Sequence, residues 1–140
     1  MKLRKMLDSD YQIILVGLAP EQKAALPEGI IGITRTNNVN ELRKLYAIAD
    51  VFVNPTYEDN FPTTNIEALA CGTPIITYQT GGSPEIVKKC GGFVIKQGNV
   101  LEIVSKCRNL KKSEVIIDSN FVSKENDNLM VVRKYIKLYE

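Results

Sequence analysis

No histidine occurs among the 140 residues of the chain. This absence excludes catalytic triads that depend on histidine and metal hydrolases that use histidine ligands. Cysteine is scarce: the chain has three, an odd number without C-x-x-C spacing, at Cys71, Cys90 and Cys107. We therefore expect reduced thiols in a cytoplasmic protein and no metal site.

Long apolar runs and strong charge are also lacking. No run is long enough to cross a membrane, and the basic residues 1–10 lack the apolar stretch of a signal peptide. The formal charge is only +2, without a dense lysine cluster, which argues against a nucleic-acid partner. The length and composition predict one globular domain with a hydrophobic core.

Short apolar runs, typical of buried parallel strands, alternate along the chain with helical patterns. The runs are residues 12–16, 30–34, 51–53, 75–77 and 93–95. Helical patterns cover residues 1–8, 19–26, 40–49, 64–70, 100–110 and 126–139, and a further helix begins at Ser83-Pro84-Glu85. This alternation predicts a single α/β domain with a mostly parallel sheet and right-handed crossovers.

Local residue types predict several helix ends. Asn40 and Ser83 are expected N-caps, and Pro84 suits the first position of its helix. Gly72 fits the C′ position after the helix over residues 64–70.

Ligands of an open parallel sheet bind beyond the carboxyl ends of its strands. Four segments leave those ends: residues 17–20, 35–39, 54–63 and 79–82. Two of them run into helix starts, whose free N–H groups suit a phosphate ligand. Neither G-x-G-x-x-G nor a P-loop lysine motif occurs, so a dinucleotide-dependent dehydrogenase and a P-loop ATPase are poorly supported.

Residues 57–87, YEDNFPTTNIEALACGTPIITYQTGGSPEIV, carry most of the chemical content. They resemble the signature of the family-4 retaining glycosyltransferases, which have the GT-B fold. That signature has two acids eight positions apart, then E-A-x-A-C-G-x-P and G-G-x-P-E. Glu67 matches the second acid and Asp59 stands eight positions before it, whereas Glu58 stands nine before. We align Asp59 with the first acid, and Glu58 remains the alternative.

The resemblance implies a Rossmann-like domain and a set of site residues. Asp59, facing the donor sugar, and Glu67, accepting from the ribose hydroxyls, would be the catalytic pair. Backbone N–H groups at the following helix start would hold the diphosphate, and residues 35–38 would lie near the nucleobase. The implied donor-binding residues are Gly17, Leu18, Arg35, Thr36, Asn37, Asn60, Phe61, Pro62, Thr63, Thr64, Gly81 and Gly82.

The resemblance further implies the reaction. A hexosyltransferase of this kind moves a sugar, with retention, from a nucleotide-sugar to a glycan or lipid-linked acceptor. It needs no metal or other cofactor, because dipoles and cationic side chains stabilise the leaving diphosphate. The complete enzyme would associate with membranes peripherally.

Simpler interpretations stay open for the same residues. Thr64-x-x-Glu67 is also a capping box, and Asp59 suits a turn. The Gly81-Gly82 pair suits a turn as well, and Cys71 suits small buried packing. Tyr57 and Phe61 suit a cleft wall, and Arg35 an exposed surface.

By the same resemblance, residues 1–140 correspond to the C-terminal, donor-binding half of the enzyme, without its first strand and without the N-terminal acceptor domain. The absent strand belongs between the strands at 12–16 and 51–53. We expect these two strands to close up, or another chain to fill the gap by association, or the fold to be weakened. Alone, the chain is expected to lack transferase activity.

Two alternatives concern the function as a whole. One is a non-catalytic nucleotide-sugar-binding subunit that a partner chain completes. The other is a sugar epimerase of the GT-B fold, against which the lack of histidine and the signature both argue.

Overall fold

The computed structural model describes residues 2–117, and the helix predicted over residues 126–139 lies outside them. The strands are β1 (Ile13–Val16), β2 (Ile30–Ile33), β3 (Phe52–Asn54), β4 (Ile75–Tyr78) and β5 (Phe93–Ile95). The helices are α1 (Lys2–Met6), α2 (Pro20–Ala24), α3 (Val39–Ile48), α4 (Thr63–Ala70), α5 (Ser83–Cys90) and α6 (Val100–Asn109), and the 3-10 turn η1 is Lys112–Glu114. Each predicted strand is therefore present within a residue or so of its expected bounds.

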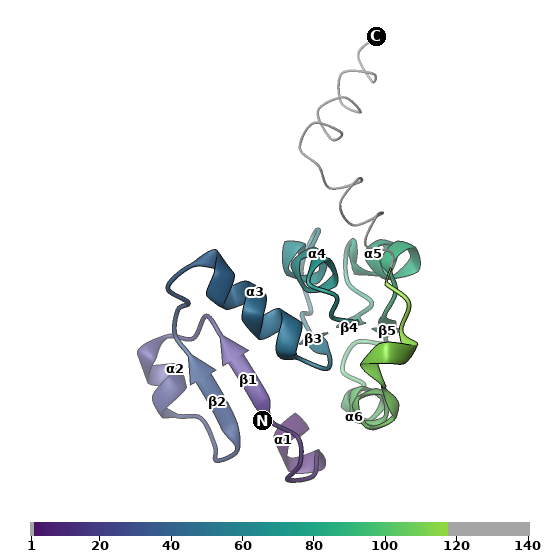
Figure 1. The fold of residues 1–140 in the computed structure, drawn as a ribbon. Coiled ribbons are helices and arrows are strands. Elements are labelled where there is room, and N and C mark those ends of the chain that lie inside the picture. The colour runs from purple at the N-terminus through teal and green to yellow at the C-terminus, as the bar shows by residue number, and fades with distance from the viewer. Residues whose placement is uncertain (1, 118–140) are drawn as a thin grey trace.

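The strands form two parallel sheets where one continuous sheet was expected (Figure 1). β1 pairs with β2, and β4 lies between β3 and β5. Within the described residues β1 and β3 do not pair with each other, so the gap between them stays open. Their inner edges therefore keep backbone groups that no neighbouring strand satisfies.

The hydrophobic core surrounds β4, whose four residues are all buried. Ile75 packs with side chains of α4 and α5 on one face. Ile76 and Tyr78 pack with Ile95 and with Ile103 of α6 on the other face. This division follows from the alternation of side chains along a strand. Because both faces of β4 are covered, its four residues do not alternate between buried and exposed, and the buried Thr77 hydroxyl donates to the Asn54 carbonyl at 3.1 Å.

Two predicted N-caps are wrong by one or two positions. α3 is capped by Asn38 rather than Asn40, because the Asn38 side chain accepts from the Glu41 N–H at 2.9 Å. α5 is preceded by Gly82, and Ser83 is its first residue and fully buried. The predicted C′ glycine after α4 is confirmed, since Gly72 has a φ of +75°.

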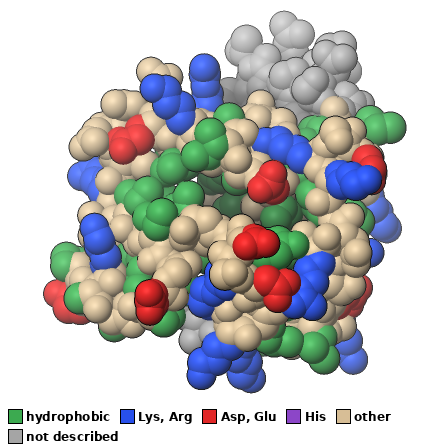
Figure 2. Space-filling view, turned by 60° about the horizontal axis from the view of Figure 1, so that its bottom comes forward, with side chains coloured by type: hydrophobic (Ala, Val, Ile, Leu, Met, Phe, Trp, Pro, Cys, Tyr) green, Lys and Arg blue, Asp and Glu red, His purple; other side chains and the backbone are tan. Residues whose placement is uncertain are grey.

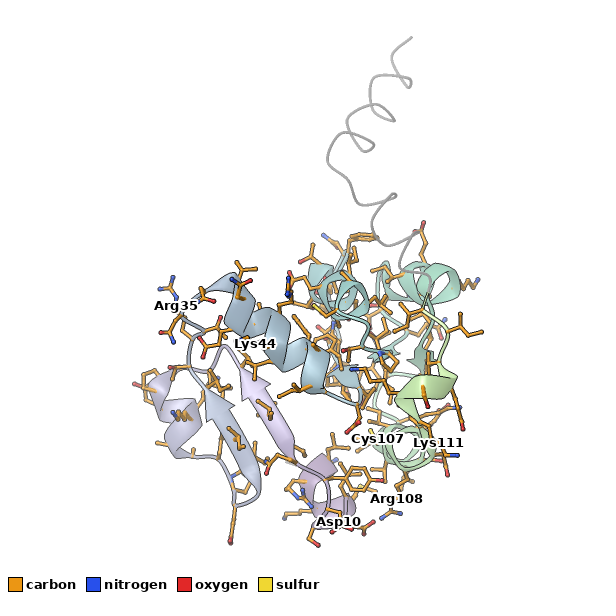
Figure 3. The ribbon with its side chains drawn as sticks, in the orientation of Figure 1. Asp10, Arg35, Lys44, Cys107, Arg108 and Lys111 are labelled. Carbon is orange, nitrogen blue, oxygen red and sulfur yellow. The ribbon has the colours of Figure 1, made fainter. Side chains whose placement is uncertain are left out.

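α1 is attached to the three-stranded half of the molecule. Arg108 of α6 donates to the Met6 carbonyl at 3.1 Å and meets the Asp8 carboxylate at 3.2 Å. Figure 3 shows Arg108 beside the end of α1. Arg4 in turn donates to the carbonyls of Leu7, Asp8 and Tyr11, which holds the segment that follows α1 against the helix. No helix in the described part of the chain has the length and apolar character needed to span a bilayer.

Candidate functional site

The carboxyl ends of β3, β4 and β5 bring three loops together. Thr80, after β4, donates through its hydroxyl to the Thr56 carbonyl at 2.9 Å. Gln97, after β5, donates to the Tyr57 carbonyl and to the Thr80 hydroxyl, each at 3.0 Å. These side chains hold the start of the loop over residues 55–62, which carries the predicted donor-binding turn. Thr80 and Gln97 were not predicted from the sequence, because only the sheet places them beside this loop.

The two glycines after β4 lie directly under the same loop. A Cβ on Gly81 would stand 1.8 Å from the Asp59 carbonyl oxygen, and one on Gly82 would stand 2.5 Å from the Phe61 ring. The Gly82 N–H donates to the Asn60 carbonyl at 2.8 Å. The chain's own loop therefore requires glycine at position 81, where the close contact is with backbone, whereas the crowding at Gly82 comes from the exposed Phe61 ring. Contact of this pair with a donor remains a prediction.

Asp59 is exposed and forms a local turn. One of its carboxylate oxygens accepts from the Phe61 N–H at 3.0 Å. This bond fixes the direction of the side chain and leaves the second oxygen to accept from another group.

α4 begins with N–H groups that no side chain caps. Pro62 occupies the N-cap position, and its residue type offers no acceptor side chain. Thr64 is already the second residue of the helix, so the capping box predicted as an alternative for Thr64 and Glu67 is not formed. The Glu67 carboxylate instead accepts from the Tyr46 hydroxyl of α3 at 3.2 Å. Burial raises the pKa of Tyr46, and the Glu67 carboxylate raises it further, so this phenol stays protonated.

A buried polar chain supports the helix starts from below. Asn54, the last residue of β3, donates to the fully buried Asn65 of α4 at 3.0 Å. Asn65 in turn donates to the Ser83 hydroxyl of α5 at 3.4 Å. This chain joins the end of β3 to the first turns of two helices. A polar residue on the inward face of a helical pattern was the available signal for Asn65.

Burial also raises the pKa of the Cys71 thiol. A protonated thiol is a weak nucleophile, which agrees with a packing role for this residue. Among the described residues, no three His, Cys, Asp or Glu side chains group in a way that could hold a metal ion.

The remaining predicted site residues lie in the segments that follow β1 and β2. Gly17 follows β1 with a φ of +85°, and nothing lies within 4 Å of the place of its Cβ, so its conformation rather than crowding favours glycine. The backbone N–H of Leu18 donates to the Ile33 carbonyl at 3.3 Å. Asn37 donates through its backbone and side chain to the Glu41 carboxylate at 2.7 and 3.0 Å. Arg35 lies near the start of α3, on the side away from α4 (Figure 3).

The family model described as "Glycosyl transferases group 1" matches residues 1–128. The chain belongs to this glycosyltransferase family. The match includes the anchored loop, the start of α4, Glu67 and the Gly81-Gly82 pair, together with the β1–β2 unit.

Curated relatives of this glycosyltransferase chain are much longer than the chain itself. It is 33% identical over 81 residues to the Sulfoquinovosyl transferase SQD2 of Arabidopsis thaliana, covering 55% of the chain and 16% of the relative. It is 30% identical over 92 residues to the Alpha-maltose-1-phosphate synthase of Mycobacterium tuberculosis, covering 56% and 24%. A D-inositol 3-phosphate glycosyltransferase of Streptomyces bingchenggensis is 45% identical over 60 residues, covering 43% and 13%.

Solved structures confirm the fold of the glycosyltransferase chain. A Sucrose-phosphate synthase from Thermosynechococcus elongatus matches with a TM-score of 0.57 and 18% identity, over 76% of this chain and 38% of that one. The structure of Anabaena HepE in complex with UDP-glucose also has a TM-score of 0.57, with 16% identity, over 99% of this chain and 51% of that one. The predicted α/β architecture of GT-B glycosyltransferases, with parallel sheets flanked by helices, is therefore confirmed.

Proposed function

We propose that residues 1–140 form the C-terminal, donor-binding domain of a family-4 glycosyltransferase. In the complete enzyme it transfers a hexose, with retention, from a nucleotide-sugar to a glycan or lipid-linked acceptor. It works in the cytoplasm, with peripheral membrane association, and residues 1–140 alone are inactive. The observation that carries this proposal is the anchored loop over residues 55–62, which leads directly into the uncapped start of α4.

The start of α4 supplies what a diphosphate needs. The first N–H groups of a helix have no partner within the helix, and the helix dipole adds partial positive charge there. Thr63 and Thr64 are exposed at this start, and no side chain competes for their N–H groups as a cap. Fixed dipoles of this kind stabilise a leaving diphosphate without a metal.

Glu67 supplies the acceptor for the ribose. It lies one turn further along α4 and is exposed, so its carboxylate can accept hydrogen bonds from hydroxyl groups of a ligand. Asp59 stands in the turn before the helix, where its second carboxylate oxygen can face the sugar.

The test of this proposal is Glu67→Gln, with binding of UDP, GDP and ADP measured by calorimetric titration. Loss of one charge-assisted contact, about 1.5–3 kcal/mol, should raise the Kd of the bound diphosphate at least about tenfold. The melting temperature should change little, because the Glu67 side chain does not cap its own helix and a glutamine can still accept from the Tyr46 hydroxyl.

Glu114→Gln is the matched control. Glu114 is exposed in η1, where it pairs with Lys111 at 3.0 Å, so its loss should change neither the melting temperature nor the Kd. If Glu67→Gln melts early and binds normally, Glu67 is a structural residue and the assignment is wrong.

A second candidate is a non-catalytic nucleotide-sugar-binding subunit that a partner chain completes. The open gap between β1 and β3 favours it, since these edges can accept a strand. Figure 2 shows apolar side chains gathered around a hollow in the middle of one face. Molecular mass measured with and without a co-expressed acceptor domain decides between the candidates: a stable complex of the two separate chains supports the second.

A further inference from the structure

Tyr46 lies outside the signature and yet contacts its second acid. It stands on α3, twenty-one positions before Glu67, and its hydroxyl donates to Oε2 of Glu67 at 3.2 Å. Glu67 is exposed on α4, where a glutamate otherwise samples several rotamers. One hydrogen bond from a fixed neighbour therefore restricts the direction in which this carboxylate points.

Tyr46 is itself held from several sides. Its ring meets Phe52 edge to face, with the ring centroids 5.4 Å apart. Its carbonyl accepts from the Thr73 hydroxyl. Lys112 donates to the carbonyls of Ala47 and Ala49, the first and third residues after Tyr46. The end of α3 is thus fixed against the loop before β4, and the phenol with it.

The hydrogen bond leaves Glu67 able to bind a ligand. A carboxylate has about four lone-pair directions, and Tyr46 occupies only one of them, on Oε2. Burial and the neighbouring carboxylate both raise the pKa of Tyr46, so it remains a donor and never competes as an anion.

We propose that Tyr46 is a positioning residue, whose hydroxyl orients the Glu67 carboxylate toward the ribose of a bound nucleotide. This inference rests on the proposed function of Glu67, and it adds a residue of α3 to the donor site. Tyr46 would act on ribose recognition through Glu67 without touching the ligand.

Tyr46→Phe tests the proposal, because it keeps the ring and removes only the hydroxyl. Binding is titrated with UDP, GDP and ADP and with their 2′-deoxy counterparts. The Kd of the bound ribonucleotide should rise about three- to tenfold, the range expected for one hydrogen bond. The preference for ribose over 2′-deoxyribose should fall by a similar factor, whereas a purely structural role would leave this preference unchanged. Tyr11→Phe, in the loop after α1, serves as the control and should alter neither quantity.

The double variant shows whether Tyr46 acts through Glu67. Tyr46→Phe combined with Glu67→Gln should bind no more weakly than Glu67→Gln alone. Losses that multiply would overturn the proposal, as would a Tyr46→Phe variant that melts early with its ribose preference intact.

The outcomes separate this inference from the proposed function. If Glu67→Gln weakens binding and Tyr46→Phe does not, only the positioning role is wrong. If Glu67→Gln leaves binding unchanged, or the wild-type chain binds none of the diphosphates, the proposed function and the positioning role are both overturned.

Discussion

Gly81 and Gly72 show two different reasons for glycine at the scale of the single residue. Both have a positive φ, +46° for Gly81 and +75° for Gly72. A Cβ on Gly81 would stand 1.8 Å from the Asp59 carbonyl oxygen, whereas nothing lies within 4 Å of that position at Gly72. Gly72 needs only its backbone conformation, while Gly81 also needs the space.

We expect Gly81→Ala to destabilise the chain clearly more than Gly72→Ala. The positive φ alone costs an alanine about 1–2 kcal/mol, and the clash with backbone at Gly81 should bring the total above about 3 kcal/mol. Urea unfolding of both variants measures the two costs. Equal losses would mean that the loop over residues 55–62 does not rest on Gly81.

Residue types alone predicted part of the site and missed the rest. Glu67 and Asp59 were assigned from the signature, and their roles in donor binding remain predictions. Asn65 and Gln97 were missed, because their contacts with Asn54 and Tyr57 join segments that only the fold brings together. Local spacing carries no information on which side chain will stand at the end of a neighbouring strand.

At the scale of the element, α3 depends on a cation that comes from much later in the chain. The last carbonyl groups of a helix have no partner within it. Lys112 of η1 donates to the carbonyls of Ala47 and Ala49 at 2.7 and 2.9 Å. Its positive charge also suits the negative end of the helix dipole.

Lys112→Met should lower the free energy of unfolding by about 1.5–3 kcal/mol, because it removes hydrogen bonds from a charged donor while keeping an apolar stem. Lys111→Met is the matched control. Lys111 pairs with the exposed Glu114 at 3.0 Å, a surface contact, so its loss should cost less than about 0.5 kcal/mol. Urea unfolding compares the two, and a Lys112 variant no worse than the control would contradict the role of this cation.

The N-cap of α3 illustrates why element boundaries are hard to predict. Asn37, Asn38 and Asn40 all have side chains suited to capping. The Glu41 N–H pairs with Asn38, and the Glu41 carboxylate pairs with Asn37, so this reciprocal arrangement selects Asn38. Residue type favours asparagine in general, whereas hydrogen-bond geometry chooses among the three.

At the scale of the whole molecule, the two halves are unequally packed. Apart from Leu7 and Pro62, the buried hydrophobic side chains of the described residues all come from residue 68 onward. In the β1–β2 unit, Val16 and Ile31 are 41% and 47% exposed. The apolar strands of this unit therefore lack the cover that such strands have inside a complete sheet.

We expect the chain to associate through the open edges. The Gly17 N–H donates to Ile33 of β2, so by alternation the Leu15 N–H faces β2 and the Val16 N–H faces the gap. Val16→Pro should preserve the fold and weaken association at least about tenfold, since proline blocks pairing at this edge. Light scattering across a concentration series measures association.

Leu15→Pro is the control, because it removes a donor from the β1–β2 ladder and should disrupt that unit itself. A wild-type chain of monomeric mass at every concentration would show that the open edges do not drive association. If Val16→Pro associates as strongly as the wild-type chain, the contact between copies lies elsewhere.

The sequence by itself determined the strands, their parallel alternation with helices, the C′ glycine after α4 and the family. These features depend on apolar runs and local backbone preferences, which a linear pattern contains. Only the tertiary structure decided that the strands form two separate sheets, that the loop over residues 55–62 packs against Gly81 and that the Tyr46 hydroxyl donates to Glu67. Each of these joins segments that are distant in sequence, so packing and hydrogen-bond geometry in three dimensions select the partners.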